Sequence, residues 1–512
     1  MTAMTLVSRV LGLVREQVRA IYLGTGAASD AFGIATTIPN LFRRLFAEGA
    51  MTAAFVPIFT EYLKKSSAEE TRRFLSRFVT WLTFIVTLFT ILGIILTPQI
   101  IQIFFASEFA NVPGKVALTI TLTQIMWPYL VFVTIAAVLQ GILNAHHIFG
   151  PSAFAPVLMN LGIIVGALAL AEVMPDPSYA LVIGFLLGGV LQLVFQVPWL
   201  FRSTPIRFGV DFHFRDPGVN RLIKVMAPGM FAAGVYQFNV FASQLIAAGL
   251  EEGSVSSLQY SIRLQELVLG LFVVSVAQVI LPRLSEQTAL EDHEGVKRTT
   301  SYAVRLIAFV TLPCTVLLVL LAEPIVKALF QFGAFDQRST EATAFALRFH
   351  ALGLFFIGQA RVLTQVFFAY KDLKSPLWVS AGDLVVNIGL CLALSLPLAQ
   401  GGIALAASLA ALVQSVALHA LLARRLGSLG LGALLARVGR MALAAAVMAG
   451  ALLGLDALWP AAGITSRVTL FGWLALAGAL AAGTYLVCAH LAGADELDEL
   501  WSALKRKLRR KR

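Results

Sequence analysis

The chain carries little charge for its length. Only 13% of its 512 residues are charged, whereas 58% are hydrophobic, and the mean hydropathy is +0.82. Because a soluble globular protein carries about a quarter charged residues, this composition excludes that class. Apolar runs of about 20 residues, each long enough to cross a bilayer, recur from end to end, without the period-2 alternation of an outer-membrane barrel. The sequence therefore predicts an all-α polytopic membrane protein.

The sequence also lacks the motifs of enzymes and cofactor sites. Its three cysteines, Cys314, Cys391 and Cys488, lie far apart in apolar segments and match no disulfide framework or metal-ligand spacing. There is no Walker A loop, so the chain is not itself an ATPase. We therefore expect no catalytic residue, no metal and no cofactor. Arg9 and Arg15 lie inside the first apolar run and no signal-peptidase site follows, so we expect this run to be a retained helix.

The length of the apolar runs predicts about fourteen membrane spans. They fall near residues 4–23, 28–60, 78–104, 121–144, 152–172, 179–201, 222–249, 255–282, 299–321, 340–370, 377–396, 402–422, 438–457 and 469–491. Alternate loops are rich in Lys and Arg, which places these loops and both termini in the cytoplasm. The opposite loops are nearly free of them, with Lys115, Arg338 and Arg467 as exceptions. This bias explains most of the +11 net charge without a nucleic-acid partner.

The chain repeats itself at an offset of 225 to 227 residues. Four pairs of similar segments keep this offset in order: 55–62 with 280–287, 97–105 with 323–331, 138–151 with 362–376, where one residue is inserted and the ends are 225 apart, and 159–164 with 386–391. Each copy holds six spans, an even number, so both copies enter the membrane in the same sense. This is the parallel repeat found in several transporter folds, and it suggests two lobes, a central cavity and alternating access.

The repeat divides the chain into four expected parts. These are an N-terminal lobe of six spans at 1–203, a cytoplasmic linker at 204–221, a C-terminal lobe of six spans at 222–430, and an extra two-helix hairpin with a basic tail at 431–512. The tail ends in LKRKLRRKR, residues 504–512. Two interpretations of this end stay open: it lies on anionic lipid headgroups, or it only fixes the orientation of the last helix.

Charged residues lie inside several expected spans, where a charge is costly and usually faces protein or water. They are Arg9, Arg15, Arg19, Asp30, Arg43, Arg44 and Glu48 in the first two spans, Arg263 and Glu266 in span eight, and Arg348 and Arg361 in span ten. Residues three or four positions apart share a helix face and can pair. This spacing predicts three ion pairs: Arg44 with Glu48, Arg263 with Glu266, and Glu16 with Arg19.

Arg9, Arg15 and Arg43 have no obvious local acidic partner. Because a guanidinium group binds two phosphate oxygens at once and stays charged at cellular pH, this excess predicts an anionic, phosphate-bearing substrate. The alternative is that the arginines extend to the cytoplasmic interface. In the repeat Arg43 aligns with Val268, so the arginines belong to one copy only. We expect Arg43 to face the substrate and Arg44 to be structural.

Residues 8–62 resemble the N-terminal signature of the bacterial lipid II flippase family MurJ, also called MviN. Their sequence is SRVLGLVREQVRAIYLGTGAASDAFGIATTIPNLFRRLFAEGAMTAAFVPIFTEY. RLQELVLGLFVVSVAQVILPRLS at 263–285, ALFQFGAFD at 328–336 and LKSP at 373–376 are similar to further segments of the family. The family belongs to the multidrug/oligosaccharidyl-lipid/polysaccharide exporter superfamily. The resemblance covers essentially the whole chain, including the two extra spans.

The resemblance implies a flippase rather than an enzyme. Its substrate would be lipid II, the undecaprenyl-diphosphate-linked disaccharide-pentapeptide, moved from the inner to the outer leaflet of the bacterial cytoplasmic membrane for cell-wall synthesis. The family's cavity residues match Arg9, Arg15, Arg43, Arg263, Asp30, Glu266, Ser8 and Ser256. Membrane lipids and cell-wall synthesis proteins are the further partners implied, and spans thirteen and fourteen would form a groove for the lipid tail.

The energy source stays open. Some members of the family use sodium, with carboxylates in spans seven and eleven. Here span seven, YQFNVFASQLIAAG at 236–249, has no acid, whereas span eleven keeps Asp383 and Asn387. Coupling to the membrane potential, to protons or to sodium is therefore compatible with the sequence.

Two other functions also stay open. An exporter of another polyprenyl-linked saccharide or of a drug would share the twelve-span core but would give no reason for the last hairpin. Exporters of cationic drugs usually need acidic cavities, which argues against them here. A non-transporting scaffold for cell-wall assembly would tolerate neutralisation of the cavity charges, whereas a flippase would not.

Overall fold

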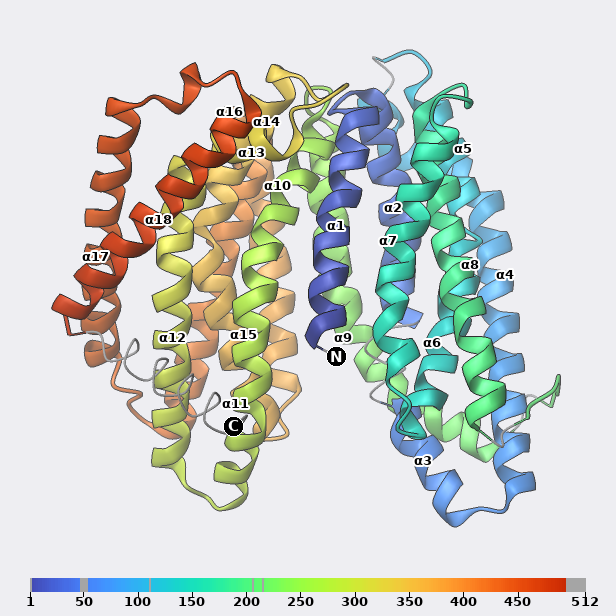
Figure 1. Ribbon diagram of the computed structural model, residues 1–512. Coiled ribbons are helices and arrows are strands. Elements are labelled where there is room, and N and C mark those ends of the chain that lie inside the picture. The colour runs from blue at the N-terminus through green and yellow to red at the C-terminus, as the bar shows by residue number, and fades with distance from the viewer. Residues whose placement is uncertain (1, 47–53, 110–111, 205–206, 214–215, 494–512) are drawn as a thin grey trace. The chain divides into compact units, whose positions relative to one another are not determined.

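The computed structural model describes residues 2–46, 54–109, 112–204, 207–213 and 216–493, and this part of the chain is helical without a strand (Figure 1). The all-α prediction is therefore confirmed. The helices are α1 (Thr2–Leu23), α2 (Ala27–Phe46), α3 (Val56–Lys65), α4 (Ala68–Phe109), α5 (Lys115–Met126), α6 (Tyr129–Ala145), α7 (Gly150–Leu170), α8 (Pro177–Ser203), α9 (Pro217–Ala248), α10 (Ser254–Val268), the π-helical η2 (Leu269–Val273), α11 (Val274–Ala289), α12 (His293–Leu320), α13 (Ala322–Phe330), α14 (Gln337–Leu352), α15 (Leu354–Ala369), α16 (Lys374–Leu426), α17 (Leu431–Leu458), the 3₁₀ turn η3 (Ala461–Gly463) and α18 (Arg467–Leu491).

The chain forms two compact units. Unit 1 comprises Met1–Ser256 with Phe332–Asp336, and unit 2 comprises Ser257–Gln331 with Gln337–Arg512. Helix α9, which starts the expected C-terminal lobe, packs on α2 and α4 of unit 1. The repeat is defined by the sequence, whereas the compact units are defined by contacts between residues. The lobe boundaries drawn from the repeat therefore stay a prediction.

Unit 1 is built on a close helix pair. Gly162 and Gly166 of α7 face Gly184 and Gly188 of α8, and a Cβ on Gly162 would lie 2.4 Å from the Gly188 nitrogen. Small residues four apart on both helices let the backbones approach, which is the usual packing device of membrane helices. Large apolar side chains from α1, α2, α5, α6, α7 and α8 then fill one common core.

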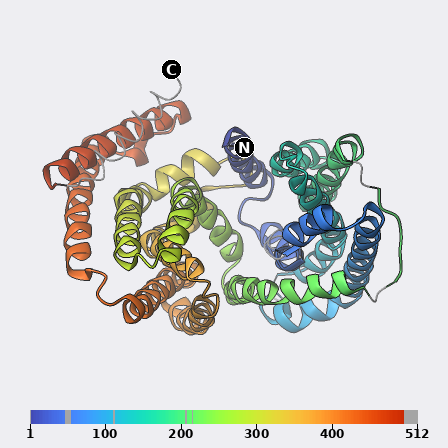
Figure 2. The ribbon, with the colours of Figure 1, turned by 90° about the horizontal axis from the view of Figure 1, so that it is seen from below.

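Unit 2 carries the C-terminal hairpin at its margin (Figures 1 and 2). Trp473 and Tyr485 of α18 pack with Met448 of α17 and Phe309 of α12 in one buried cluster. Polar contacts fix the hairpin turn to α13: Lys327 Nζ donates to the Ile464 carbonyl at 3.2 Å, and Arg467 Nη2 donates to the Ala328 carbonyl at 2.8 Å. The hairpin is therefore an integral part of unit 2.

Within the described residues, each of the fourteen expected spans falls on one helix or on neighbouring helices. Among the described residues, nine helices are long and apolar enough to cross a membrane, or ten if α14 and α15, bent by 44°, form one span. Helix α16 covers two expected spans, and its non-helical residue Ala399 lies between them. The crossing number of fourteen stays a prediction, because α1, α2 and α9 are not among these helices.

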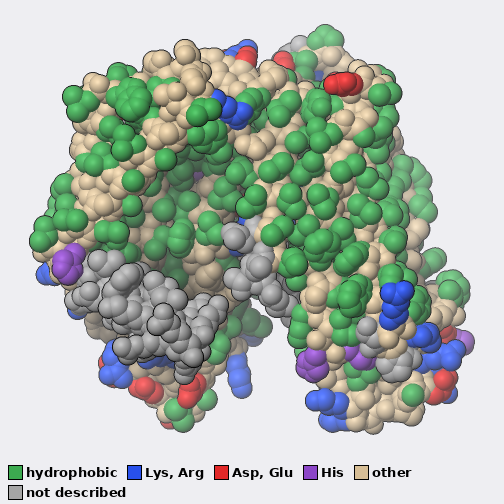
Figure 3. Space-filling view, viewed as in Figure 1, with side chains coloured by type: hydrophobic (Ala, Val, Ile, Leu, Met, Phe, Trp, Pro, Cys, Tyr) green, Lys and Arg blue, Asp and Glu red, His purple; other side chains and the backbone are tan. Residues whose placement is uncertain are grey.

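The surface of unit 1 fits a membrane environment. Exposed apolar side chains lie along α7 and α8, including Val165, Leu168 and Val194. Lys, Arg and His side chains gather at the lower end of the same face (Figure 3). This arrangement is the one expected when an apolar belt lies in lipid and a basic rim lies in water.

Candidate functional site

Asp30, in the first turn of α2, is almost completely buried in unit 1. Its carboxylate accepts four hydrogen bonds: from Lys115 Nζ, Gly253 N–H and Ser256 N–H at 2.9 Å each, and from the Ser256 hydroxyl at 2.8 Å. The two N–H groups belong to the start of α10, so Asp30 caps that helix and faces the positive end of its dipole. Lys115 supplies the counter-charge and lies over the Phe109 ring, with Nζ 4.0 Å from the centroid.

A second carboxylate caps in the opposite direction. Glu252 Oε1 accepts the N–H of Ala27, the first residue of α2, at 2.7 Å. The two capping contacts join residues 225 and 226 positions apart, which is the offset of the internal repeat. The starts of two repeat-equivalent helices therefore hold each other. We call Ala27, Asp30, Lys115, Glu252, Gly253 and Ser256 the helix-start cluster.

The backbone around the helix-start cluster is too close for side chains. Gly24 has a φ of +55°, and a Cβ there would lie 2.2 Å from the Ala334 carbonyl oxygen. Gly253 has a φ of +92°, and its Cβ would lie 2.3 Å from the Thr25 carbonyl oxygen. Only glycine enters this left-handed region without strain. Both positions therefore require glycine for the turns to close against each other.

A second polar cluster joins α1 to α7 within unit 1. Arg15 donates to Glu16 at 2.5 Å and to Asn160 Oδ1 at 3.1 Å, and Asn160 donates to the Ser8 carbonyl at 3.0 Å. Glu16 also lies 3.8 Å from Arg19, as their spacing predicts. The expectation that Arg15 has no local acidic partner is wrong. Adjacent side chains lie on different helix faces, but these two are long and largely buried, so they meet.

Arg19 is buried and ties α1 to α2. Its Nη2 donates to the Ser29 carbonyl at 3.2 Å and to the Ser29 hydroxyl at 3.3 Å, and its guanidinium lies 5.1 Å from the Phe32 ring centroid. These contacts, with Glu16, engage the group inside unit 1. We therefore assign Arg19 to structure.

The adjacent arginines near the end of α2 have different surroundings. Arg43 Nε donates to Asn40 Oδ1 at 2.9 Å, and the Arg44 guanidinium lies 5.8 Å from the Tyr236 ring centroid on α9. Both arginines are half-buried. Glu48, the expected partner of Arg44, lies outside the described residues. The Arg44–Glu48 pair therefore stays a prediction, and an aromatic ring is the contact that the structure gives Arg44.

Ser8 and Arg9 are half-buried near the start of α1. Ser8 enters the Asn160 contact through its backbone carbonyl. Gly12, one turn further on, faces the same side chain, and a Cβ there would lie 3.8 Å from Asn160 Nδ2. Helices α1 and α7 are therefore close at the level where Arg9 and Arg15 project.

In unit 2 the charged residues are more exposed. Arg263 Nη1 and Glu266 Oε2 of α10 lie 2.8 Å apart, which confirms their predicted pairing, and their side chains are 48% and 41% exposed. Arg348 of α14 and Arg361 of α15 are exposed as well. The charges of unit 2 that sequence analysis placed in its spans are therefore not enclosed within that unit.

The eight candidate substrate-binding residues divide between the units. Unit 1 holds Ser8, Arg9, Arg15, Asp30, Arg43 and Ser256, and unit 2 holds Arg263 and Glu266. The structure brings Asp30 against Ser256, and Arg15 near Ser8 through Asn160. Asp30 and Ser256 are buried against each other, so this contact must open before either touches a ligand. Substrate binding stays a prediction for all eight.

Sequence reasoning missed three residues that hold these clusters together. Lys115 is an exception to the charge bias of the loops, and this exception is the feature of the sequence that could have indicated its role. Asn160 is a polar residue in an apolar span, and the repeat places Asn387 at the equivalent position. Glu252 carries no signal of its own in the sequence, because its role depends on two distant helix starts that meet in space.

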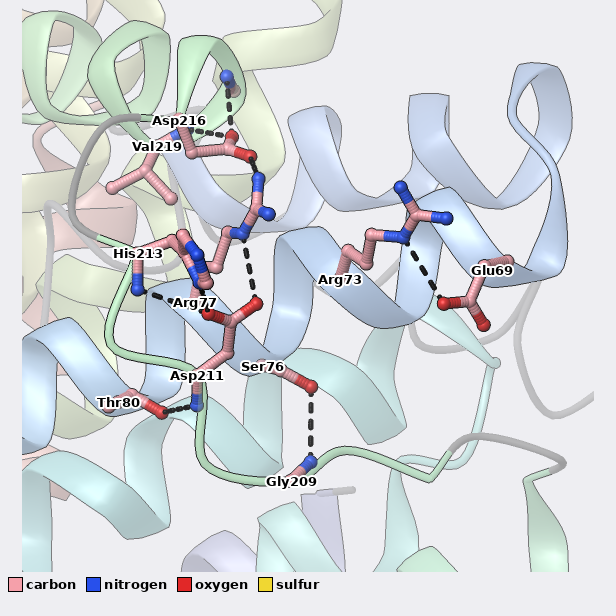
Figure 4. Close-up of polar contacts among 11 residues, drawn as sticks. Glu69, Arg73, Ser76, Arg77, Thr80, Gly209, Asp211, His213, Asp216 and Val219 are labelled. Atoms are coloured by element: carbon pink, nitrogen blue, oxygen red, sulfur yellow. Dashed lines mark hydrogen bonds and ion pairs between the residues drawn. The ribbon is translucent and has the colours of Figure 1, made fainter.

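The linker is attached to α4 by a third network (Figure 4). Arg77 Nε donates to Asp211 at 3.0 Å and Arg77 Nη1 to Asp216 at 2.8 Å. The His213 ring and the Arg77 guanidinium, in that order of effect, hold the pKa of Asp211 at about 2, well below its usual range. Asp216 also accepts the N–H groups of Gly218 and Val219 and so caps α9. These contacts hold the linker against α4 and at the start of α9.

The fold and these clusters define a class. A helical membrane protein with an internal parallel repeat, whose repeat-equivalent helix starts are joined by breakable polar contacts, has the architecture of a transporter that alternates between conformations. The chain belongs to the family described as "Lipid II flippase MurJ", whose model matches residues 19–472. The family resemblance of the sequence is thereby confirmed.

Individual relatives agree with this assignment. The chain is 36% identical to the probable lipid II flippase MurJ of Vibrio cholerae over 93% of this chain and 92% of the relative. It is 33% identical to the lipid II flippase MurJ of Burkholderia cenocepacia over 75% of each chain. A solved lipid II flippase MurJ in an inward closed conformation superposes with a TM-score of 0.81 at 26% identity, over 97% of this chain and 99% of that one.

A more distant solved structure shares the fold. An inward-facing multidrug resistance transporter of the MATE family, in the MOP superfamily, superposes with a TM-score of 0.70 at 15% identity. It covers 82% of this chain and 95% of its own. The core architecture is therefore common to transporters that differ widely in sequence.

Proposed function

We propose that this protein is a lipid II flippase that moves the undecaprenyl-diphosphate-linked peptidoglycan precursor from the inner to the outer leaflet of the bacterial cytoplasmic membrane. The observation that carries the proposal is the family match over residues 19–472 together with 36% identity to a probable lipid II flippase over nearly the whole chain. The protein is a transporter and not an enzyme, so its residues bind and release the lipid without changing a covalent bond.

The arginines supply the interaction that a diphosphate needs. Arg9, Arg15, Arg43 and Arg263 are the proposed contacts, because a guanidinium fork binds phosphate oxygens in pairs and offsets their desolvation. Arg15 is already positioned by Glu16 and Asn160, which leaves its orientation fixed before the substrate arrives. Preorganisation of this kind lowers the entropy cost of binding.

Alternating access requires the helix-start cluster to open and close. In the present structure the Ser256 hydroxyl donates to the Asp30 carboxylate. Opening would free the Asp30 carboxylate and leave Lys115 without its partner. The cluster therefore sets part of the energy difference between the two states, and a diphosphate at the arginines would shift that balance.

The energy source that we propose for transport follows from the positive charge of the arginine site. A net positive site that moves through the membrane field couples to the membrane potential by about 2.3 kcal/mol per elementary charge per 100 mV. Proton or sodium coupling remains compatible with this scheme. By the positive-inside rule, we place both termini and the linker in the cytoplasm. Cell-wall synthesis proteins would receive the product outside.

The test is complementation of a bacterial strain depleted of its own lipid II flippase, with exposure of lipid II at the outer face as the readout. The wild-type chain is expected to restore exposure, and Arg43→Ala and Arg263→Ala to abolish it at normal protein level. Arg73→Ala is the matched control, because Arg73 forms an exposed ion pair with Glu69 (Figure 4). Failure of the wild-type chain in several host strains would overturn the proposed function; normal exposure in both arginine variants would overturn the arginine assignment alone.

A further inference from the structure

Unit 2 contains a cavity of about 820 Å³ between α11, α12 and α17. Four arginines line it: Arg283 of α11, Arg298 and Arg305 of α12, and Arg437 of α17. We call it the arginine cavity. Its volume lies within the range of about 300–1,000 Å³ that is usual for small-molecule sites. None of the candidate substrate-binding residues lines it, so it is a separate feature of the molecule.

No acidic side chain lines the arginine cavity among the described residues. The acids nearest in sequence have other partners: Glu294 pairs with Lys297 at 2.7 Å, and Asp292 caps the start of α12. Within the described part of the chain, Arg283 and Arg298 form no ion pair. Like charges around one space repel each other. An anion inside the cavity would therefore remove repulsion as well as gain attraction.

Neutral donors stand beside the arginines. Ser301, Tyr302 and Gln287 also line the cavity, and Thr299 donates to Gln287 Oε1 at 2.9 Å. The Arg305 guanidinium lies 5.9 Å from the Tyr302 ring centroid. Guanidinium forks combined with hydroxyl and amide donors match the oxygens of a phosphate better than those of a carboxylate, which has only two.

The arginine cavity adjoins an apolar surface. Along α17, Leu435, Leu443 and Val447 are exposed by more than half, whereas Met441 and Met448 face inward and pack in the buried cluster with α12. One helix therefore offers cationic side chains at its start and a lipid-facing apolar strip beyond it. A soluble phosphate would use the first feature only, whereas a membrane lipid would use both.

We propose that the arginine cavity binds the phosphate headgroup of an anionic membrane lipid, with the acyl chains along the exposed side of α17. The cavity lies at the α11–α12 turn and the start of α17, at the end of unit 2 that the loop charges assign to the cytoplasm. The lipid would come from the inner leaflet and would stay bound as a structural partner. This site does not depend on the proposed flippase activity.

The experiment titrates the purified full-length protein in neutral detergent with short-chain phosphatidylglycerol and follows the thermal unfolding midpoint. The wild type is expected to show a saturable rise. Arg283→Gln with Arg298→Gln is expected to raise the half-saturating lipid concentration about tenfold or more, because it removes two guanidinium groups that would donate charged hydrogen bonds to the phosphate. Both side chains are exposed, so the variant should fold.

A matched control makes the same charge change outside the cavity. Arg424→Gln with Arg440→Gln removes two exposed arginines of unit 2, one on the same helix α17, and should bind the lipid like the wild type. Equal weakening in both double variants would overturn the cavity assignment in favour of general attraction by surface charge. Unchanged binding in the cavity variant would overturn it directly.

Two further arms identify the ligand class. Inorganic phosphate at the same concentration should give a much smaller shift, and equal protection would overturn the lipid assignment. Phosphatidylcholine, which carries phosphate without net charge, should bind more weakly, and equal binding would overturn the requirement for an anion. Arg283→Lys with Arg298→Lys keeps the charge without the forks and is expected to fall between the wild type and the glutamine variant.

Discussion

The two units treat their charges in opposite ways. In unit 1 the side chains of Lys115 and Asp30 are only 4% and 2% exposed, and further hydrogen bonds satisfy the carboxylate. In unit 2 the side chains of Arg263 and Glu266 are 48% and 41% exposed. A buried pair costs stability when one partner is lost, whereas an exposed pair contributes little. Loss of one partner of a charge pair should therefore lower stability more in unit 1 than in unit 2.

The largest effect is expected at the helix-start cluster. Asp30→Ala leaves Lys115 buried without a counter-charge and removes the cap of α10. Breaking a buried pair in this way costs about 3–5 kcal/mol, so the thermal unfolding midpoint of the purified protein should fall strongly.

A double variant tests whether the loss comes from the uncompensated lysine. Asp30→Asn with Lys115→Met removes both charges and keeps side chains of similar volume, so it should be more stable than Asp30→Ala. An unfolding midpoint for Asp30→Ala equal to that of the wild type would show that the buried Asp30–Lys115 pair contributes no more to stability than the exposed pair of unit 2.

The next effect is expected at Arg15. Arg15→Ala removes the guanidinium that donates to Asn160 Oδ1 and to Glu16, and Arg19 lies further from Glu16, at 3.8 Å. Unsatisfied buried groups cost about 1–3 kcal/mol each, so the unfolding midpoint should fall measurably but less than for Asp30→Ala. Arg15→Lys keeps the charge and should recover part of the loss. Equal midpoints for the alanine variant and the wild type would place Arg15 with the exposed charges of unit 2.

The repeat explains why the fold was predictable and these clusters were not. Apolar runs and the offset of 225 to 227 residues predict helix positions, because both follow from local composition. At the offset of 225 residues Arg15 corresponds to Val240 and Arg19 to Gln244, so the copies share helices but not charges. The four-bond environment of Asp30 joins segments more than 80 residues apart. Spacing rules cover three or four residues and do not reach such contacts.

A smaller effect on stability is expected in unit 2. Arg263→Ala removes one partner of an exposed pair, which contributes no more than about 1 kcal/mol, so the unfolding midpoint should stay close to that of the wild type. Exposure of lipid II in the complementation test should nevertheless be lost. If the midpoint instead falls as far as for Arg15→Ala, the difference between the units does not lie in burial.

The smallest effect is local and returns to unit 1. The side chains of Arg77 and Asp211 are 23% and 22% exposed. This pair therefore lies in the same unit as Asp30 but is less buried. The pKa of Asp211 is lowered to about 2 from its usual 3.8. Because the folded-state pKa is the lower one, the contribution of Asp211 to linker attachment is complete above about pH 4. It is lost as the pH falls through 2.

Hydrogen exchange of the linker measures this loss without unfolding the protein. The backbone N–H groups of Gly209 and Asp211 donate to the hydroxyls of Ser76 and Thr80 at 3.0 Å each, so they are protected while the linker is attached. At pH 6 Asp211→Asn should exchange faster than the wild type over residues 207–213, and the difference should narrow as the pH falls to 2, where about half of the wild-type carboxylate is protonated. Comparison at equal pH cancels the intrinsic pH dependence of exchange. A difference that stays constant down to pH 2 would mean that the ionised carboxylate does not hold the linker. The exposed fraction of a charge pair would then fail to predict how strongly that pair contributes.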